Sequence, residues 1–371
     1  MIRVLQIISD TNIGGGGRSL LSYLQYYDRS RFHMEVALPR GSALTDRVRA
    51  LDVPTHEIDA MADRSLDRAA LAPLRRLIRQ LDPDLIHTHG ALTGRIAGRL
   101  EGRKVVYTKH CAFPPSGLLA SPPGRLANGL LDGLLADGVV AIGPSAREIL
   151  RASGIPDRRI HVLFNGVPPL PEPTPEQREA SRARYGFSPG DFVLGILARV
   201  EEYKGHGTIL EAVRQLVDQG RPVRLLVAGE GSYLGQVRQQ AGTLPPGTVV
   251  LAGFVREVEQ ALWAMDVQIN ASYESETSSL SLLEGMSIGL PAVVSNCGGN
   301  PLLIHDGENG LVFPARDSGA LAGRVARLMD RPEELAQMRR RAREIFAAQF
   351  TGEIFAKNVE QIYLDILKGA K

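Results

Sequence analysis

Short apolar runs recur along the whole chain, and each is followed by a segment whose apolar positions repeat with the period of a helix. The runs are nearly continuous rather than alternating, which is typical of strands buried on both faces of a parallel sheet. The predicted strands are Val4–Ile8, Met34–Leu38, Leu85–His87, Val105–Thr108, Val139–Ile142, Val193–Leu197, Arg224–Ala228, Val249–Leu251, Val267–Asn270 and Ala292–Ser295.

Helical periodicity fills the segments between these strands. The clearest predicted helices are Ser19–Tyr27, Leu71–Leu81, Ser145–Arg151, Thr208–Gln219 and a last helix from Glu353 to Leu367. Strands that alternate with helices indicate parallel sheets covered by helices on both faces. We therefore predict an α/β protein whose ligands bind beyond the carboxyl ends of the strands.

A proline-rich stretch divides this series of strands and helices into two parts. Five prolines lie between Pro168 and Pro175, and such a segment is stiff and non-helical. The predicted domains are residues 1–167 and 177–352, joined by a linker at residues 168–176, with residues 353–371 following the second domain.

Composition and charge narrow the class of protein. The 371 residues are 44% apolar and 23% charged, with a formal net charge of +2, whereas a nucleic-acid-binding domain is usually strongly basic. Cys111 and Cys297 lie far apart without metal-ligand spacing around them, which predicts reduced thiols in a cytoplasmic protein. The sequence contains no run of about 18 apolar residues, so we expect no membrane-spanning helix. The first residues are typical of a strand rather than a signal peptide.

Two glutamates eight residues apart, Glu276 and Glu284, flank a predicted helix start. On one continuous helix this spacing means about 12 Å of rise and about 80° of rotation, so the carboxylates would not face each other as the acid–base pair of a glycosidase, which needs roughly 5–9.5 Å. Ser278 or Ser279 is a suitable N-cap residue. Glu276 would then lie on the loop and Glu284 inside the helix, on two sides of an anion site. That arrangement is the outline of a nucleotide-sugar site.

Several motifs around this pair resemble one enzyme family. They are Glu276 to Glu284, Gly289-Leu290-Pro291, Gly298-Gly299 and Asn309-Gly310. This set is similar to the signature of the retaining glycosyltransferases of family 4, which have the GT-B fold. The chain departs from the family pattern at Thr277-Ser278-Ser279, where Gly-Phe-Gly is usual, and at Leu302, where glutamate is usual.

The resemblance implies a fold and a function. The fold is GT-B, with two Rossmann-like parallel-sheet domains that face a central cleft and a last helix that crosses back to the first domain. The function is retaining transfer of a hexose from a UDP- or GDP-sugar to a hydroxyl acceptor, without a covalent protein nucleophile, a metal ion or a cofactor. The alternatives are a nucleotide-sugar epimerase, a GT-B phosphorylase and a non-catalytic nucleotide-sugar-binding protein.

Candidate catalytic and donor-binding residues lie in the second domain. Arg199 and Lys204 follow its first strand and precede Gly205; two cations and a glycine suit a diphosphate, although a solvated basic turn has the same composition. The resemblance assigns the diphosphate to this pair, the sugar to Glu276 and the ribose to Glu284. It assigns the remaining donor contacts to Gly229, Glu230, Phe254, Val255 and the backbone N–H groups of Ser278, Ser279 and Leu280.

Candidate residues in the first domain follow its strands. Gly14 to Gly17 precede the predicted helix at Ser19, and the resemblance implies that Gly15, Gly16 and Gly17 face the donor phosphates. It also implies that His110 contacts the donor sugar. Arg18 and His89 are candidate acceptor contacts. His87 and His89 point the same way on a strand and could bind a metal, but no third ligand lies nearby, so packing or acceptor lining is favoured.

The acceptor side of the first domain combines positive charge with apolar sequence. Residues 64–104 hold nine basic and four acidic side chains, a net charge of +5. The irregular segment Phe113–Pro123 follows, and then five leucines between Leu126 and Leu135. Such a surface could dock on the anionic inner face of a membrane and receive a lipid-linked glycan, as in polysaccharide or lipopolysaccharide assembly; the alternative is a solvated helix beside an ordinary core helix.

Overall fold

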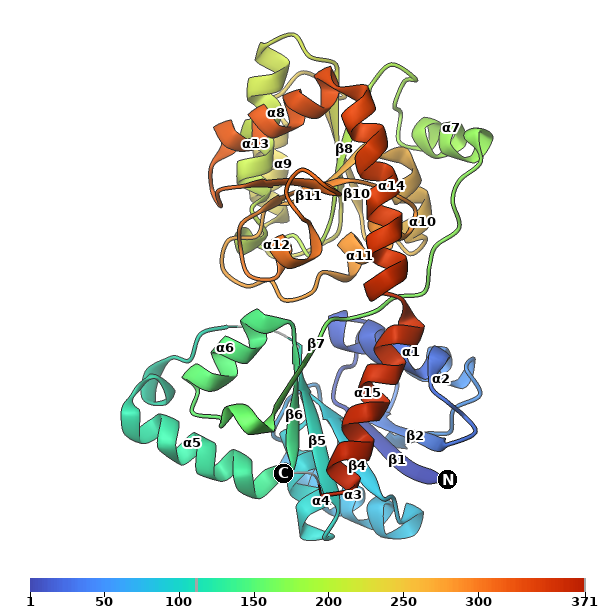
Figure 1. The fold of residues 1–371 in the computed structure, drawn as a ribbon, viewed down its shortest axis with the longest axis vertical. Coiled ribbons are helices and arrows are strands. Elements are labelled where there is room, and N and C mark those ends of the chain that lie inside the picture. The colour runs from blue at the N-terminus through green and yellow to red at the C-terminus, as the bar shows by residue number, and fades with distance from the viewer. Residues whose placement is uncertain (111–112, 370–371) are drawn as a thin grey trace. The chain divides into compact units, whose positions relative to one another are not determined.

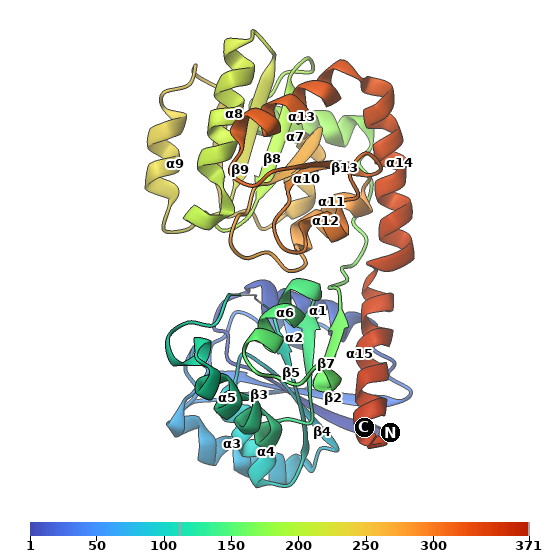
Figure 2. The same cartoon turned by 60° about the vertical axis from the view of Figure 1, so that its left-hand side comes forward.

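The computed structural model describes residues 1–110 and 113–369, so Cys111 lies outside the described residues. The chain forms two compact units. The first unit comprises Met1–Val167 together with Thr351–Lys371, and the second comprises Pro168–Phe350. Figures 1 and 2 show that each unit is a sheet with helices on both faces.

The first unit contains a seven-stranded parallel sheet in the order β3-β2-β1-β4-β5-β6-β7. Its strands are β1 (Ile2–Ile8), β2 (Phe32–Pro39), β3 (Thr55–Ile58), β4 (Leu85–His89), β5 (Lys104–Lys109), β6 (Gly138–Ile142) and β7 (Ile160–Leu163). Its helices are α1 (Gly15–Tyr26), α2 (Thr45–Arg49), α3 (Arg68–Leu81), α4 (Leu92–Leu100), η1 (Gly117–Ala120), α5 (Pro122–Leu135), α6 (Pro144–Ala152), η2 (Asp157–Arg159) and α15 (Gly352–Leu367). Because β1 pairs with both β2 and β4, the strand order reverses between β1 and β4.

The central strand β1 explains how this sheet is buried on both faces. Val4 and Ile8 lie in one apolar cluster with residues of α1 and α15, whereas Leu5 and Ile7 lie in another with residues of α3. Successive side chains of a strand point to opposite faces, so a continuous apolar run satisfies both clusters. Gln6, on the α15 face, is fully buried.

Helix α15 belongs to the first unit although it follows the second unit along the chain. Thr351 caps it, since the Thr351 side chain accepts a hydrogen bond from the N–H of Ile354. Tyr363 is fully buried and packs edge-on against Tyr23 of α1. At Gly352 a Cβ atom would overlap the ring of Tyr26, so α15 and α1 approach closely there.

The second unit contains a six-stranded parallel sheet in the order β10-β9-β8-β11-β12-β13. Its strands are β8 (Phe192–Leu197), β9 (Val223–Ala228), β10 (Val249–Gly253), β11 (Val267–Asn270), β12 (Ala292–Ser295) and β13 (Gly310–Phe313). Its helices are α7 (Pro175–Arg184), η3 (Glu202–Lys204), α8 (His206–Asp218), α9 (Leu234–Ala241), α10 (Val258–Ala264), α11 (Leu280–Ser287), α12 (Asn300–Leu303), α13 (Ser318–Asp330) and α14 (Pro332–Gln349). The strand order reverses between β8 and β11.

Several helices begin earlier than the sequence predicts, and the starts of α1 and α7 have clear physical causes. Helix α1 begins at Gly15 rather than Ser19, so three of the four glycines form its first turn; at Gly17 a Cβ would come 2.9 Å from the side chain of Leu44. Helix α7 begins at Pro175, inside the expected linker, because Thr174 and Gln177 form a capping box and proline suits the first helical position.

Among the described residues, every helix is too short or too polar to cross a lipid bilayer.

Candidate active site

The main candidate site lies where the strand order of the second unit reverses. Arg199 and Lys204 follow β8, and Glu276 follows the neighbouring strand β11, so all three come from the carboxyl edge of adjacent strands. In open α/β sheets this is where ligands bind. Gly205 ends the turn in a left-handed conformation, with a φ of 75°, and a Cβ there would overlap the carbonyl of Ala271. Glycine therefore lets the two loops meet.

The side chains of Lys204 and Glu276 form an ion pair across this edge. Lys204 Nζ donates to Glu276 Oε2 at 2.9 Å, and both side chains are largely buried, with 15% and 9% exposed. The same oxygen accepts hydrogen bonds from Asn270 Nδ2 and Ser272 Oγ, each at 3.0 Å. Burial by itself would raise the pKa of the Glu276 carboxyl. The charge of Lys204 and the hydrogen bonds from these donors have a larger effect and lower this pKa below its usual value.

The glycines after β12 hold the Glu276 loop in place. A Cβ on Gly298 would overlap the carbonyl of Glu276, and one on Gly299 would overlap the carbonyl of Thr277. The N–H of Gly299 donates to the Glu276 carbonyl at 3.0 Å. The backbone of the loop is therefore packed directly against Gly298-Gly299, with no space for side chains.

Helix α11 begins next to this loop. Its N-cap residue is Ser279, which confirms the expected helix start and places Glu276 outside the helix. Ser278 is buried, and Glu284 is buried inside the helix with 6% of its surface exposed. The first N–H groups of a helix have no partner within the helix and favour anions. The loop and α11 thus bring one carboxylate, a buried serine and a helix N-terminus to one edge of the sheet.

The other predicted donor contacts surround this edge. The exposed Arg199 donates to the Tyr203 hydroxyl at 2.7 Å. Gly229 follows β9 with a φ of 146°, where a Cβ would overlap the Ala198 carbonyl. Glu230 comes next, and its carbonyl accepts the N–H of Val200 at 2.8 Å.

After β10, Phe254 is 65% exposed, so its ring does not belong to the apolar core. Val255 is instead partly buried against an apolar cluster. An exposed aromatic ring is available for stacking, whereas Val255 can contribute backbone contacts.

The candidate residues of the first unit gather at its own point of reversal. Gly15 and Gly16 open α1 after β1, and His110 follows β5. A Cβ on Gly16 would lie 3.3 Å from His110 Cδ2 and 3.5 Å from Asp10 Oδ2, so these side chains flank the glycine turn. Removal from water lowers the pKa of His110 to about 4. Arg18 follows in the same helix and is partly exposed.

Asp10 was missed by the sequence analysis. Burial and the nearby charge of Asp63 raise the pKa of the Asp10 carboxyl. The available signal was its position, two residues after the end of β1 and four before Gly14. A carboxylate there adjoins the edge where ligands of parallel sheets bind.

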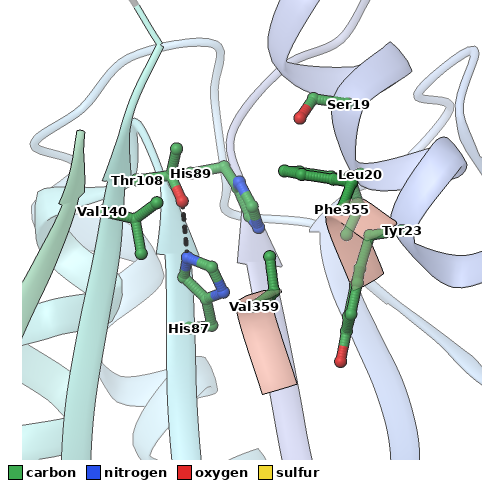
Figure 3. A pocket seen from close by; sticks show the side chains of 9 residues that line it. All are labelled: Ser19, Leu20, Tyr23, His87, His89, Thr108, Val140, Phe355 and Val359. Atoms are coloured by element: carbon green, nitrogen blue, oxygen red, sulfur yellow. Dashed lines mark hydrogen bonds between the residues drawn. The ribbon is translucent and has the colours of Figure 1, made fainter. Parts of the chain in front are cut away.

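His89, expected as an acceptor contact, instead lies within the protein and is 6% exposed. One ring nitrogen is 3.0 Å from His110 Nε2 and the other is 3.0 Å from Gln6 Oε1. The ring of the nearby His87 is hydrogen-bonded to the hydroxyl groups of Tyr363 and Thr108. A cavity of about 10 Å³ lies beside the two histidines, and Figure 3 shows them with Ser19 and Phe355 around it. Both ring nitrogens of His89 are therefore occupied by hydrogen bonds, one to His110 and one to Gln6. His89 contacts His110 from the interior of the first unit.

Among residues 1–110 and 113–369, no group of three or more histidine, cysteine, aspartate or glutamate side chains is arranged as a metal site. The second cysteine, Cys297, is a free thiol beside Gly298.

The positive charge of segment 64–104 is less available to bind an anionic surface than its sequence suggests, because most of its basic side chains form ion pairs. The pairs are Arg64–Asp67, Arg75–Glu101, Arg79–Glu101, Arg95–Asp132, Arg99–Asp137, Arg103–Asp82 and Lys104–Asp137. Several of these acids lie outside the segment or at its end, so the net charge of the sequence overstates the free positive charge of the surface.

Comparison with known proteins places the chain among sugar-transferring enzymes. Family models described as glycosyl transferases group 1 and glycosyltransferase family 4 match residues 191–331 and 13–169. EpsD of Bacillus subtilis (strain 168), provisionally named as a glycosyltransferase, is 27% identical over 80% of this chain and 81% of EpsD. The alpha-monoglucosyldiacylglycerol synthase of Streptococcus pneumoniae is 26% identical over 85% of this chain and 74% of that enzyme.

A solved structure of Anabaena Alr3699/HepE, in complex with UDP and glucose, covers 98% of this chain and 100% of its own with a TM-score of 0.83 and 20% identity. Its likeness shows the same two-sheet fold. The relatives and family models describe glycosyltransferases, so they give no support to the epimerase or the non-catalytic alternative. The chain is an enzyme with the GT-B fold and belongs to the family 4 glycosyltransferases of group 1.

Proposed function

We propose that this glycosyltransferase transfers a hexose from a nucleotide diphospho-sugar, most simply a UDP-sugar, to a hydroxyl acceptor with retention of configuration. The observation that carries the proposal is the buried pair of Lys204 and Glu276 where the strand order of the second unit reverses. It sets a cation and a carboxylate side by side, as a diphosphate joined to a sugar requires. HepE, solved with UDP and with UDP-glucose, supports UDP as the nucleotide.

Each side chain has a distinct role in this proposal. Arg199 and Lys204 neutralise the diphosphate as it leaves, together with the N–H groups of Ser278, Ser279 and Leu280 at the start of α11. Glu276 accepts a hydroxyl of the donor sugar and Glu284 accepts the ribose hydroxyls. The nucleotide base lies on Phe254 and the backbone of Val255, and Gly229 and Glu230 form the turn beside it. These cations supply the charge that a divalent metal provides elsewhere, so we propose transfer without a metal or cofactor.

The first unit contributes the remaining contacts in this proposal. His110 donates to or accepts from the donor sugar, and the first turn of α1, with Gly15, Gly16 and Gly17, faces the phosphates. Arg18 adjoins this turn and contacts the acceptor. Retention follows if the acceptor hydroxyl attacks from the face that the diphosphate leaves, with the leaving oxygen taking the hydroxyl proton.

The proposal is tested by thermal shift with UDP, UDP-glucose, GDP and GDP-mannose. At least one of these should raise the melting temperature of the native protein, because a ligand that binds only the folded state stabilises it. Arg199→Ala should abolish the shift. Arg221→Ala, which removes an ion pair with Asp330 away from the site, is the matched control and should retain it. If none of the four compounds shifted the native protein, the donor assignment would be wrong.

We further propose that the acceptor is carried by a lipid and that α5 docks on the membrane surface. Four leucines of this helix are exposed: Leu126 by 67%, Leu130 by 64%, Leu131 by 51% and Leu134 by 72%. The spacing of 126, 130 and 134 places three of them along one helix face.

The inner face of α5 is the polar one. Asn128 donates to the Ser153 carbonyl at 2.7 Å, Asp132 pairs with Arg95 and Arg159, and a Cβ on Gly129 would overlap the Gly154 carbonyl. The helix is thus held by polar contacts while its leucines face outward, opposite to the usual arrangement of a surface helix.

A bilayer fits this face better than a second copy of the chain. Four partly exposed leucines offer on the order of 400 Å², about half of the roughly 800 Å² per partner in a standard protein interface. The helix has one basic side chain, the exposed Arg125, and one carboxylate, the buried Asp132. No exposed negative charge on α5 therefore repels anionic lipid headgroups. The alpha-monoglucosyldiacylglycerol synthase of Streptococcus pneumoniae is named for a lipid product, which supports a lipid-borne acceptor at the inner face of a membrane.

A further inference from the structure

A chain of five hydrogen bonds runs through the first unit behind His110. The distances are 3.0 Å from His110 Nε2 to His89 Nδ1, 3.0 Å from His89 Nε2 to Gln6 Oε1, 2.9 Å from Gln6 Nε2 to the Tyr363 hydroxyl, 2.6 Å from that hydroxyl to His87 Nδ1, and 2.7 Å from His87 Nε2 to Thr108 Oγ1. Every member between the two ends is buried. The chain starts and ends near the carboxyl end of β5, because Thr108 lies two residues before His110.

Elementary chemistry fixes the donors in the two bonds that join His110, His89 and Gln6. The Gln6 carbonyl oxygen can only accept, so His89 Nε2 must carry the proton of that ring. A neutral His89 then accepts at Nδ1, and its partner, His110 Nε2, must be the donor. Burial lowers the pKa of His89 well below its usual value, which keeps the ring neutral.

The other arm can continue in the same direction. The Gln6 amide donates to the Tyr363 oxygen at 2.9 Å, and the Tyr363 hydroxyl can donate in turn to His87 Nδ1. In that arrangement His87 carries its proton on Nε2 and donates it to Thr108. Burial lowers the pKa of His87 to about 3, so this ring is also neutral. All five bonds then point in one direction, and aligned hydrogen bonds strengthen one another.

We propose that His89 is a positioning residue that holds the His110 imidazole in the tautomer with its proton on Nε2. His110 then acts as a neutral hydrogen-bonding group with Nδ1 as its accepting nitrogen, rather than as an acid. The bond that one ring nitrogen makes decides the state of the other. Gln6 and Tyr363 fix His89 in turn, so a residue of the last helix helps to set the orientation of a site residue. The proposal rests on the role of His110 in the proposed function.

Two substitutions of His89 separate positioning from packing. In His89→Asn the amide oxygen takes the place of Nδ1 and can still accept from His110, whereas in His89→Gln the amide nitrogen takes the place of Nε2 and keeps only the bond to Gln6. A purely structural role would make the two variants alike. We expect His89→Asn to keep most of kcat. We expect His89→Gln to lower kcat about tenfold or more, with little change in KM for the donor.

The decisive readout is the tautomer of His110, measured by long-range 1H–15N NMR correlation on the full-length protein labelled at histidine. This measurement needs no substrate, so it can contradict the positioning role of His89 whether or not the proposed function is right. The native protein and His89→Asn should show one tautomer, protonated at Nε2; His89→Gln should show a mixture. His33→Asn, on a partly exposed side chain of β2, is the control for assignment and should leave the His110 signal unchanged.

A native His110 protonated at Nδ1, or charged at neutral pH, would overturn the proposal without any variant. Identical tautomers and kcat in both His89 variants would show that His89 only packs. If the tautomers followed the expectation while His110→Ala left transfer intact, the positioning would stand and the role given to His110 would be wrong.

Discussion

Lys204 Nζ and Glu276 Oε2 lie 2.9 Å apart, on loops that follow two adjacent strands although the residues are 72 positions apart in the sequence. Lys204→Met should leave the Glu276 carboxylate buried without its cation and lower the free energy of unfolding by about 3 kcal/mol. Lys204→Met combined with Glu276→Gln should recover part of this loss, because no unpaired charge remains. Urea denaturation at pH 7 measures both.

Donor binding should respond differently from stability in this cycle. If Lys204 and Glu276 both contact the donor, the double variant should bind no nucleotide sugar even where its stability has recovered. A double variant that is more stable than Lys204→Met and still binds UDP-glucose normally would show that the pair is structural.

Acidification should destabilise the first unit through its buried histidines. Burial lowers the pKa of His87 to about 3 and that of His110 to about 4, and it also depresses the pKa of His89. The unfolded chain therefore binds more protons than the native protein between these values and the ordinary histidine pKa of about 6.5. Stability should be full above this range and fall with decreasing pH, by up to about 1.4 kcal/mol per pH unit for each histidine.

The variant His87→Gln checks this assignment. It removes one titrating group, so the slope of the unfolding free energy against pH between 4 and 6 should decrease by an amount equivalent to the uptake of up to about one proton. Above pH 7 the slopes of the native protein and the variant should coincide. Equal slopes at acid pH would mean that His87 is already protonated in the native state or is not protected from water.

A carboxylate adds a loss of stability in the same direction, but at lower pH, in the second unit. The pKa of Glu276 is lowered in the folded protein, so its contribution to stability is complete above the unfolded value of about 4.3 and is lost as the pH falls through the folded value. Glu276→Gln should therefore flatten the stability curve below pH 4 and leave its shape between pH 5 and 7 unchanged. Chemical denaturation across this range separates the two effects.

Gly299→Ala should damage donor binding more than folding. The backbone conformation at Gly299 is helical, with a φ of −81°, and is open to alanine, but the new Cβ would overlap the carbonyl of Thr277. The loop of Glu276 must move, and we expect the affinity for the donor to fall about tenfold or more. The control is Gly323→Ala in α13, where a Cβ meets no atom within 4 Å; it should bind the donor normally. Isothermal titration with UDP-glucose compares them.

Replacing the leucines of α5 should abolish membrane binding without unfolding the protein. The double variant Leu130→Ser/Leu134→Ser should lose flotation with vesicles that contain phosphatidylglycerol, whereas Leu66→Ser/Leu302→Ser, on exposed leucines elsewhere, should retain it. Because most nearby arginines are already paired, binding should weaken only modestly between 50 and 300 mM salt. A change in oligomeric state in place of vesicle binding would assign the leucine face to a second copy of the chain.

The central strands were predictable because their burial on both faces requires continuous apolar sequence. Val267–Asn270 and Ala292–Ser295 match β11 and β12 at both ends. The strands that were missed are β3, β7 and β13, each four residues long and each at the edge of a sheet. Polar residues interrupt Thr55–Ile58 and Ile160–Leu163, because an edge strand is less completely buried and its sequence is less constrained.

The site was predictable only as far as local motifs reach. The helix start at Ser279 and the position of Glu276 outside it followed from capping preferences. The hydrogen bonds behind His89 did not, because its partner Gln6 is held by Tyr363, 357 positions away, and the two meet only when α15 packs on the sheet. Asp10 was missed because a single aspartate after a strand is a weak signal, and its significance comes from its closeness to the Gly16 turn and His110.

Helix α15 also constrains how the protein is made. Tyr363, Phe355 and Val359 complete the apolar cluster of the first unit, yet they are synthesised only after the whole of the second unit. The first seven strands can therefore pair early during synthesis, but the space for Tyr363 beside Gln6 and His87 stays open until the second unit and α15 have been made. A nascent chain stopped after Phe350 would contain every residue of the second unit and an incomplete first one, with its buried histidines still exposed to water.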